Sequence, residues 1–163
     1  MVAGNIYGTR HGSFSTPPSA PRLRASTGAT VQMTLAANEG TKPYGVELIL
    51  DLHACDTSRF TRSAIESFFT RLCELIDMER CDLHFWDDLG VPEEDQQTNP
   101  KTKGTSAVQF ILTSTIVVHT LDLMGAVYVN IFSCKEFDTD AAASFTATWF
   151  GSTDWTANVV TRR

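Results

Sequence analysis

Four residues of this sequence are well suited to chemistry and follow one another in its second half: Ser106, Ser114, His119 and Cys134. A serine hydroxyl can attack a carbonyl carbon, an imidazole can exchange a proton near neutral pH, and a thiol can donate one. Taken singly, each has an ordinary structural explanation. Ser114 stands between two threonines in an apolar run, and Cys134 ends a hydrophobic segment where cysteine is commonly a small buried side chain. Their joint spacing is what indicates a site.

That spacing resembles the pyruvoyl-dependent S-adenosylmethionine decarboxylases of the short prokaryotic type, from about Tyr44 to the C-terminus. Three short motifs carry the resemblance: Gly104-x-Ser106, His119-Thr120 and the cysteine of Asn130-Ile131-Phe132-Ser133-Cys134. Residues 45–56 are similar to the opening strand of the family. Ser114 then falls where the family places the serine that becomes the pyruvoyl group.

The resemblance implies that the chain cuts itself between Thr113 and Ser114, giving a beta chain that ends at 113 and an alpha chain of residues 114–163. The Ser114 hydroxyl would attack the Thr113 carbonyl and form an ester. Elimination and hydrolysis would then leave a pyruvoyl group with loss of ammonia. By resemblance, His119 serves as the processing base with Ser106 in support.

The resemblance also implies what the processed chain does. The pyruvoyl ketone would form a Schiff base with the amine of S-adenosylmethionine and withdraw electrons as carbon dioxide leaves, on the way to spermidine and other polyamines. Cys134 is the expected proton donor, and Asp51 lies where the family often has an acidic residue of the substrate site. A homodimer of processed protomers is implied as well.

Two departures from the family pattern leave alternatives open. The chain has Thr113-Ser114-Thr115 where the family usually has Glu-Ser-His, and Leu121-Asp122-Leu123 where it has Trp-Pro-Glu, so that Asp122 comes one place early. The substrate could therefore be another amino acid, such as arginine or ornithine. Thr115 in place of a histidine supports a further alternative, an unprocessed binding or regulatory subunit.

Composition predicts one globular domain in the cytoplasm. The 163 residues are 42% hydrophobic and 20% charged, which suffices for a single core. The net charge of −6 leaves no basic face for nucleic acid, and no apolar run approaches the length of a membrane span. The four cysteines lack a CxxC pair, so we expect reduced thiols rather than zinc or disulfides.

The first 40 residues differ from the rest in composition. They are rich in Ser, Thr, Pro, Gly and Ala, and residues 1–38 contain three arginines and no acidic residue. We expect a disordered tail over 1–40 and a decarboxylase-like domain over 41–163. An organelle transit peptide and a translation start at Met33 are the alternatives for the tail.

The hydrophobic pattern of residues 41–163 predicts alternating short elements. Strands are expected at 47–55, 81–86, 107–113, 115–120, 125–134 and 155–160. A helix after the first strand should begin at Asp56, Thr57 or Ser58 and bury Ile65, Phe68, Phe69, Leu72 and Ile76, and a second helix should cover 139–150. This order favours an α+β two-layer sandwich, a mainly antiparallel sheet with both helices on one face.

Two further clusters have ordinary explanations. Asp51, His53 and Cys55 alternate along one strand and should share a face, but their spacing along an extended chain suits a shared metal ion poorly, and no metal site is predicted. The acidic residues of 87–88 and 93–95 could attract a cationic substrate. A solvated acidic loop is the favoured interpretation.

Overall fold

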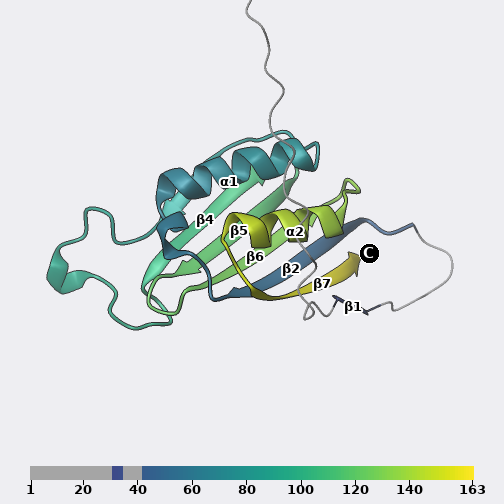
Figure 1. Ribbon diagram of the computed structural model, residues 1–163. Helices are drawn as coiled ribbons and strands as arrows, with labels where there is room; N and C mark the ends of the chain where they lie inside the picture. The colour runs from purple at the N-terminus through teal and green to yellow at the C-terminus, as the bar shows by residue number, and fades with distance from the viewer. Residues whose placement is uncertain (1–30, 35–41) are drawn as a thin grey trace, which may run out of the picture.

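The sheet and both helices form two layers (Figure 1). The computed structural model describes residues 31–34 and 42–163. It contains a seven-stranded sheet with strand order β1-β7-β2-β6-β5-β4-β3. Helices α1 (Arg62–Leu75) and α2 (Thr139–Trp149) lie on one face of that sheet. The predicted fold class, a mainly antiparallel sheet with two helices on one face, is confirmed.

Six of the strands form the antiparallel part of the sheet. They are β2 (Gly45–His53), β3 (Leu83–Trp86), β4 (Gly104–Ile111), β5 (Ser114–Leu121), β6 (Ala126–Ser133) and β7 (Asp154–Arg162). The seventh, β1 (Val31–Thr34), pairs in parallel with β7 at the sheet edge. It lies within the segment predicted as a tail, and residues 1–30 and 35–41 of that segment lie outside the described residues.

Alternation along the strands separates a buried face from an open one. On β5 the side chains of Ser114, Ile116, Val118 and Thr120 are buried on the helix side, whereas Thr115, Val117 and His119 point to the opposite face. The same period of two is seen on β2 and β6. None of the described helices covers the second face. A strand residue therefore reaches either the core or the open face according to its parity.

Helix α1 buries the predicted apolar stripe, but its predicted start was wrong. Thr61 is the N-cap, and its hydroxyl accepts the Ala64 N–H. Asp56 instead caps a short 3-10 turn at Thr57–Arg59, because its carboxylate accepts the Ser58 N–H. The buried residues of the stripe are Ile65, Phe68, Phe69, Leu72 and Ile76. They pack with the apolar strand residues into one core.

Aromatic rings join the two helices over the sheet. The Phe68 ring lies 5.0 Å from that of Phe150 and 6.0 Å from that of Phe145, which comes from α2. Asp138 caps α2 by accepting the Ala141 N–H. Such aromatic contacts hold the helix layer in place over the strands that carry the candidate residues.

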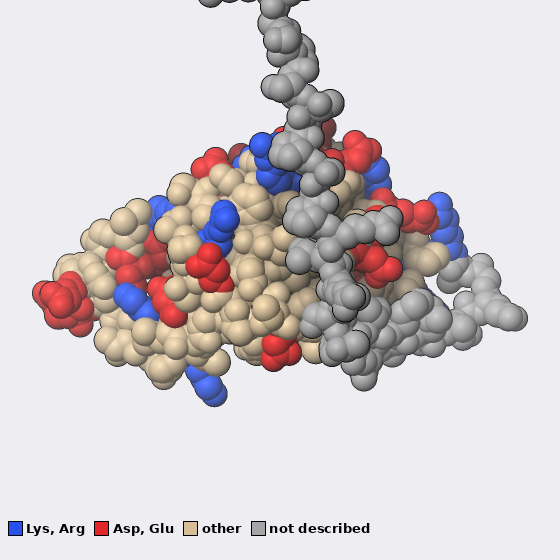
Figure 2. Space-filling view, viewed as in Figure 1, with Lys and Arg blue, Asp and Glu red and all other residues tan. Residues whose placement is uncertain are grey.

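The chain after β2 and the loop before β4 bear on two further predictions: that Asp51, His53 and Cys55 share one strand face, and that the acidic loop is solvated. Strand β2 ends at His53, and Ala54 has φ 51, so Cys55 does not continue the alternation with Asp51 and His53 as predicted. The loop after β3 projects from the body and carries a 3-10 turn at Glu93–Asp95, whose acidic side chains are exposed at its tip (Figure 2). No helix among the described residues is long and apolar enough to cross a membrane.

Candidate active site

Ser114 and Cys134 lie side by side at one end of the sheet. Ser114 opens β5 directly after a two-residue connection from β4, and Cys134 follows the last residue of β6. The Ser114 hydroxyl donates to Cys134 Sγ at 3.8 Å and accepts the Cys134 N–H at 3.3 Å. Ser114 is 4% exposed. The predicted cleavage serine and the predicted proton donor are thus in direct contact.

Thr113 also contacts the thiol of Cys134, which sequence reasoning had not anticipated. Its Oγ1 lies 3.4 Å from Cys134 Sγ. The hydrogen bond with Thr113 is the larger cause, and the one from Ser114 the second, of a pKa of Cys134 below its usual value. A lowered thiol pKa increases the fraction of thiolate at neutral pH, and proton exchange by Cys134 becomes easier.

The pair opens into a pocket of about 430 Å³. Leu112, Thr113, Asp77 and Lys135 are among the residues that line it. The Lys135 ammonium donates to the Asp77 carboxylate at 2.6 Å. This pocket is large enough for a small substrate and holds both charge signs beside a hydroxyl and a thiol.

Ser106 and His119 form a second pair at the other end of the same strands. They are direct cross-strand partners on β4 and β5, and Ser106 Oγ lies 2.8 Å from His119 Nδ1. Both side chains point to the open face, where His119 is exposed. The two residues to which the family resemblance assigns processing are therefore joined by a hydrogen bond.

Within one chain, however, the two pairs are far apart. Ser114 and His119 are five residues apart on β5, which corresponds to about 17 Å along an extended strand. Because five is an odd number, their side chains also point to opposite faces of the sheet. His119 therefore cannot reach the Ser114 hydroxyl of its own chain in this conformation.

A cross-strand row on the open face extends the Ser106–His119 pair. Trp86 is the partner of Ser106, Tyr128 is the partner of His119, and Asp51 is the partner of Tyr128. A pocket of about 410 Å³ lies on this row and is lined by both aromatic residues and both members of the pair. Sequence reasoning found Asp51 but missed Trp86 and Tyr128, although strand pairing would have aligned all three with His119.

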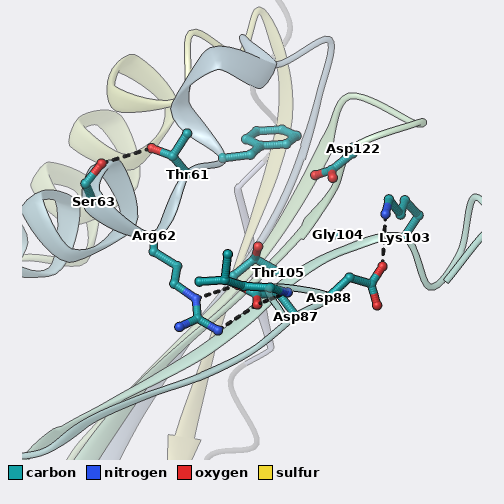
Figure 3. A pocket seen from close by; sticks show the side chains of 11 residues that line it. Thr61, Arg62, Ser63, Asp87, Asp88, Lys103, Gly104, Thr105 and Asp122 are labelled. Atoms are coloured by element: carbon teal, nitrogen blue, oxygen red, sulfur yellow. Dashed lines mark hydrogen bonds and ion pairs between the residues drawn. The ribbon is translucent and has the colours of Figure 1, made fainter. Parts of the chain in front are cut away.

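The largest of the described pockets, at about 510 Å³, lies on the helix side (Figure 3). Arg62 holds the Asp87 carboxylate through two hydrogen bonds of 2.7 and 2.6 Å, and Lys103 pairs with Asp88 at 2.9 Å. Both ion pairs are drawn in Figure 3. These two carboxylates are partly buried and engaged within the chain, so the prediction of a solvated acidic loop was wrong for Asp87 and Asp88 and fits only the exposed turn at Glu93–Asp95.

Asp122 belongs to this helix-side pocket and not to the Ser106–His119 pocket. Partial burial, with further contributions from Asp88 and Asp87, raises its pKa against the effect of Lys103. Asp122 is a turn residue that directly follows the end of β5, and it does not line the pocket of His119.

Comparisons with known proteins identify a family. The family model described as S-adenosylmethionine decarboxylase matches residues 46–163. Among solved structures, the crystal structure of the adenosylmethionine decarboxylase from Aquifex aeolicus VF5 is similar, with a TM-score of 0.59 and 18% sequence identity. The match covers 75% of this chain and 92% of that one. No curated protein sequence matches the chain.

Proposed function

The chain belongs to the S-adenosylmethionine decarboxylase family, and we propose that it is a proenzyme that cuts itself between Thr113 and Ser114 and decarboxylates S-adenosylmethionine. The contact between Ser114 and Cys134 is the observation that carries this proposal. It joins a hydroxyl next to a peptide carbonyl with a thiol of lowered pKa inside one pocket. Cleavage uses the hydroxyl and proton transfer uses the thiol, so one pocket contains a group for each proposed step.

Cleavage begins when Ser114 Oγ forms a bond to the Thr113 carbonyl carbon. The bond from that carbon to the Ser114 nitrogen breaks, the hydroxyl proton goes to the nitrogen, and an ester replaces the amide. Loss of the Ser114 α-proton then expels the Thr113 carboxylate and leaves dehydroalanine. Addition of water and release of ammonia convert it to a pyruvoyl group at position 114.

The residues around Ser114 fit a pyruvoyl group formed from it. Ser114 lies against an open pocket, and the Cys134 thiol is within 3.8 Å of its hydroxyl. When present, the pyruvoyl group supplies the electron sink for decarboxylation. Cys134 then returns a proton to the substrate carbon that has lost carbon dioxide. In the uncut chain, the Thr113 hydroxyl contacts this thiol.

We further propose a homodimer in which the partner's Ser106 and His119 assist Ser114. The separation of the two pairs within one chain supports this arrangement, because His119 does not reach its own Ser114. A twofold axis parallel to the two sheets and perpendicular to their strands would reverse strand direction. It would bring the Ser106–His119 end of one open face to the end of the other sheet where the turn of Leu112 and Thr113 leads into Ser114, twice per dimer.

The substrate is proposed to lie between these ends and to donate its amine to position 114. Asp51 offers a carboxylate, and Trp86 and Tyr128 offer ring faces, which suit the sulfonium and the adenine of S-adenosylmethionine. In this role the chain would act in spermidine biosynthesis. Arginine and ornithine are also cationic, so the test is release of labelled carbon dioxide from each of the three carboxyl-labelled compounds. Release from S-adenosylmethionine is expected, and release from another amino acid alone would reassign the substrate.

The alternative function is that of an unprocessed binding or regulatory subunit. The same separation of His119 from Ser114 favours it for a chain that remains a monomer. Such a chain would release no carbon dioxide from any of the three compounds and would keep an ordinary serine at position 114. Size measurement of the full chain in solution distinguishes the monomer from the proposed dimer.

A further inference from the structure

Leu112 has an unusual backbone for its residue type. Its φ is 53, in the left-handed region, and among the described non-glycine residues only Ala54 and Asp77 share this feature. Aspartate tolerates that conformation better than leucine because its short polar side chain can bond locally. The Leu112 side chain is 71% exposed, so core packing does not account for the conformation.

The position of Leu112 explains why its backbone is fixed. Leu112 and Thr113 are the whole connection between β4 and β5, and Ile111 pairs with Ser114 across it. The turns favoured in two-residue hairpins have a positive φ at their first residue, which is usually glycine, asparagine or aspartate. The ladder from Gly104 to Ile111 thus holds the turn closed whatever residue stands in it.

Cys81 holds the same turn from the neighbouring chain segment. Its Sγ accepts the Leu112 N–H at 3.2 Å, and its own N–H donates to the Phe110 carbonyl at 2.8 Å. Thr113, the second turn residue, is held on the other side by its contact with Cys134. Both residues of the connection are therefore tied to fixed neighbours, and the turn cannot relax without breaking these contacts.

We propose that the left-handed backbone of Leu112, held by Cys81, is a strained element that promotes cleavage of the adjacent bond between Thr113 and Ser114. A bulky residue in the left-handed region is strained, and such strain persists only where the surroundings enforce it. The inference rests on the proposed function, since it concerns the rate of that cleavage. Leu112 and Cys81 are positioning residues here and touch no reacting atom.

Strain favours the reaction because cleavage removes its cause. As Ser114 Oγ bonds to the Thr113 carbonyl carbon and the carbon–nitrogen bond breaks, the rigid amide that closes the turn becomes an ester. After elimination, Thr113 is a free chain end and Leu112 can return to a negative φ. The strain is present in the precursor and absent from the product, so its release lowers the barrier to the extent that the turn has opened in the transition state.

The test follows fragment formation in freshly made full-length chain by mass spectrometry. Leu112→Gly removes the strain and is expected to slow cleavage by about fivefold or more. Leu112→Ala retains the Cβ atom and should cleave at the wild-type rate within about twofold. Leu123→Gly, at another exposed leucine in a turn, is the matched control. Equal rates for Leu112→Gly and wild type would overturn the inference.

Cys81 and stability provide independent readouts. Cys81→Ala should also slow cleavage, and Cys81→Ser, which keeps an acceptor for the Leu112 N–H, should restore most of the rate. In the uncut Ser114→Ala chain, Leu112→Gly should melt at a higher temperature than Leu112→Ala, the reverse of the usual order. A wild-type chain that never cuts would overturn the proposed function as well, whereas a cutting chain with no effect of Leu112→Gly would overturn this inference alone.

Discussion

Each end of strand β5 carries one residue of a serine-containing pair, and the two pairs lie in different surroundings: Ser114 with Cys134 at the start, and His119 with Ser106 toward the other end. At its start, the Ser114 hydroxyl is buried on the helix side beside the Cys134 thiol. Leu112, which has a left-handed backbone, stands two residues before Ser114. Toward its other end, His119 is exposed on the open face and bonds Ser106. The first end has a hydroxyl next to the proposed cleavage bond, and the second has a hydroxyl–imidazole pair away from that bond. In the proposed dimer, each chain would therefore supply two half-sites, the first at Ser114 and Cys134 and the second at Ser106 and His119.

Ser114→Ala is expected to have the largest effect, on self-cleavage of the chain. Without the hydroxyl, no bond to the Thr113 carbonyl can form, so the chain should remain intact and carry no reactive carbonyl. Denaturing mass spectrometry of the purified variant measures this. Normal fragments from Ser114→Ala would place the cleavage bond elsewhere and show that Ser114 is not the cleavage serine.

His119→Ala tests whether the second half-site serves a partner. Alone, this variant should cut itself at least about a hundredfold more slowly, because a general base is lost. Coexpressed with Ser114→Ala, it should recover cleavage, since the partner's His119 can then act on its Ser114. A small mass tag identifies the cut chain, which should be the His119→Ala chain only.

Absence of any fragment from the coexpressed sample would contradict the two-protomer arrangement. Tyr128→Phe is a suitable control, because it changes the open face next to His119 while leaving the Ser106–His119 bond in place. Cleavage in that variant should remain close to the wild-type rate.

Cys134→Ala should separate the two proposed steps at the first half-site. Cleavage should proceed, because Ser114 keeps its hydroxyl, while correct decarboxylation should fall by about a hundredfold or more. Product analysis by mass spectrometry measures the loss. Cys55→Ala, a change at another thiol whose pKa burial raises, should leave turnover unchanged. Full turnover by Cys134→Ala would exclude it as the proton donor.

Thr113→Val should shift the titration of Cys134. The Thr113 hydroxyl is the main cause of the lowered pKa of this thiol, so its removal should move the alkylation midpoint to higher pH, while Thr113→Ser should restore it. The pH dependence of Cys134 alkylation is read from peptide masses in the uncut Ser114→Ala background. Lys135, Asp77 and Glu79 line the same pocket and are unchanged in all variants. An unmoved midpoint would show that Thr113 does not set this pKa.

Asp87→Asn should have the smallest effect and touch neither half-site. The Arg62 guanidinium lowers the pKa of Asp87, so the ion pair stabilises the fold above about pH 4 and is lost as pH falls through the folded pKa. Because Arg62 is 41% exposed, the loss at pH 7 should be about 1 kcal/mol or less. Urea unfolding should show this difference at pH 7 and a progressively smaller one as pH falls below about 4. A cleavage defect in Asp87→Asn would mean that the helix-side pocket takes part in function.

Much of the fold was predictable from local patterns. The stripe of α1 and the period of two in the strands follow from residue type, and both gave the correct layers. The start of α1 was misplaced because Asp56 is itself a good cap and begins a 3-10 turn before Thr61 caps the helix. The pairing of β1 with β7 joins segments far apart in sequence, and no local pattern specifies it.

The site was predictable in its residues but not in its arrangement. Parity alone places Ser114 and His119 on opposite faces, so the separation of the pairs was present in the sequence as an odd spacing. Asp122 lies in the turn after β5 and lines another pocket. The left-handed backbone of Leu112 left no signal, because leucine is not a residue that such turns select. The contact of Thr113 with Cys134 depends on how the ends of β5 and β6 meet.

The most direct measurement is the intact mass of the purified, denatured wild-type chain, before and after treatment with a carbonyl reagent. The account predicts two fragments that divide before Ser114, with residues 114–163 gaining the mass of the reagent. A single uncut mass that does not react would contradict self-processing and leave the chain as a binding or regulatory member of its family.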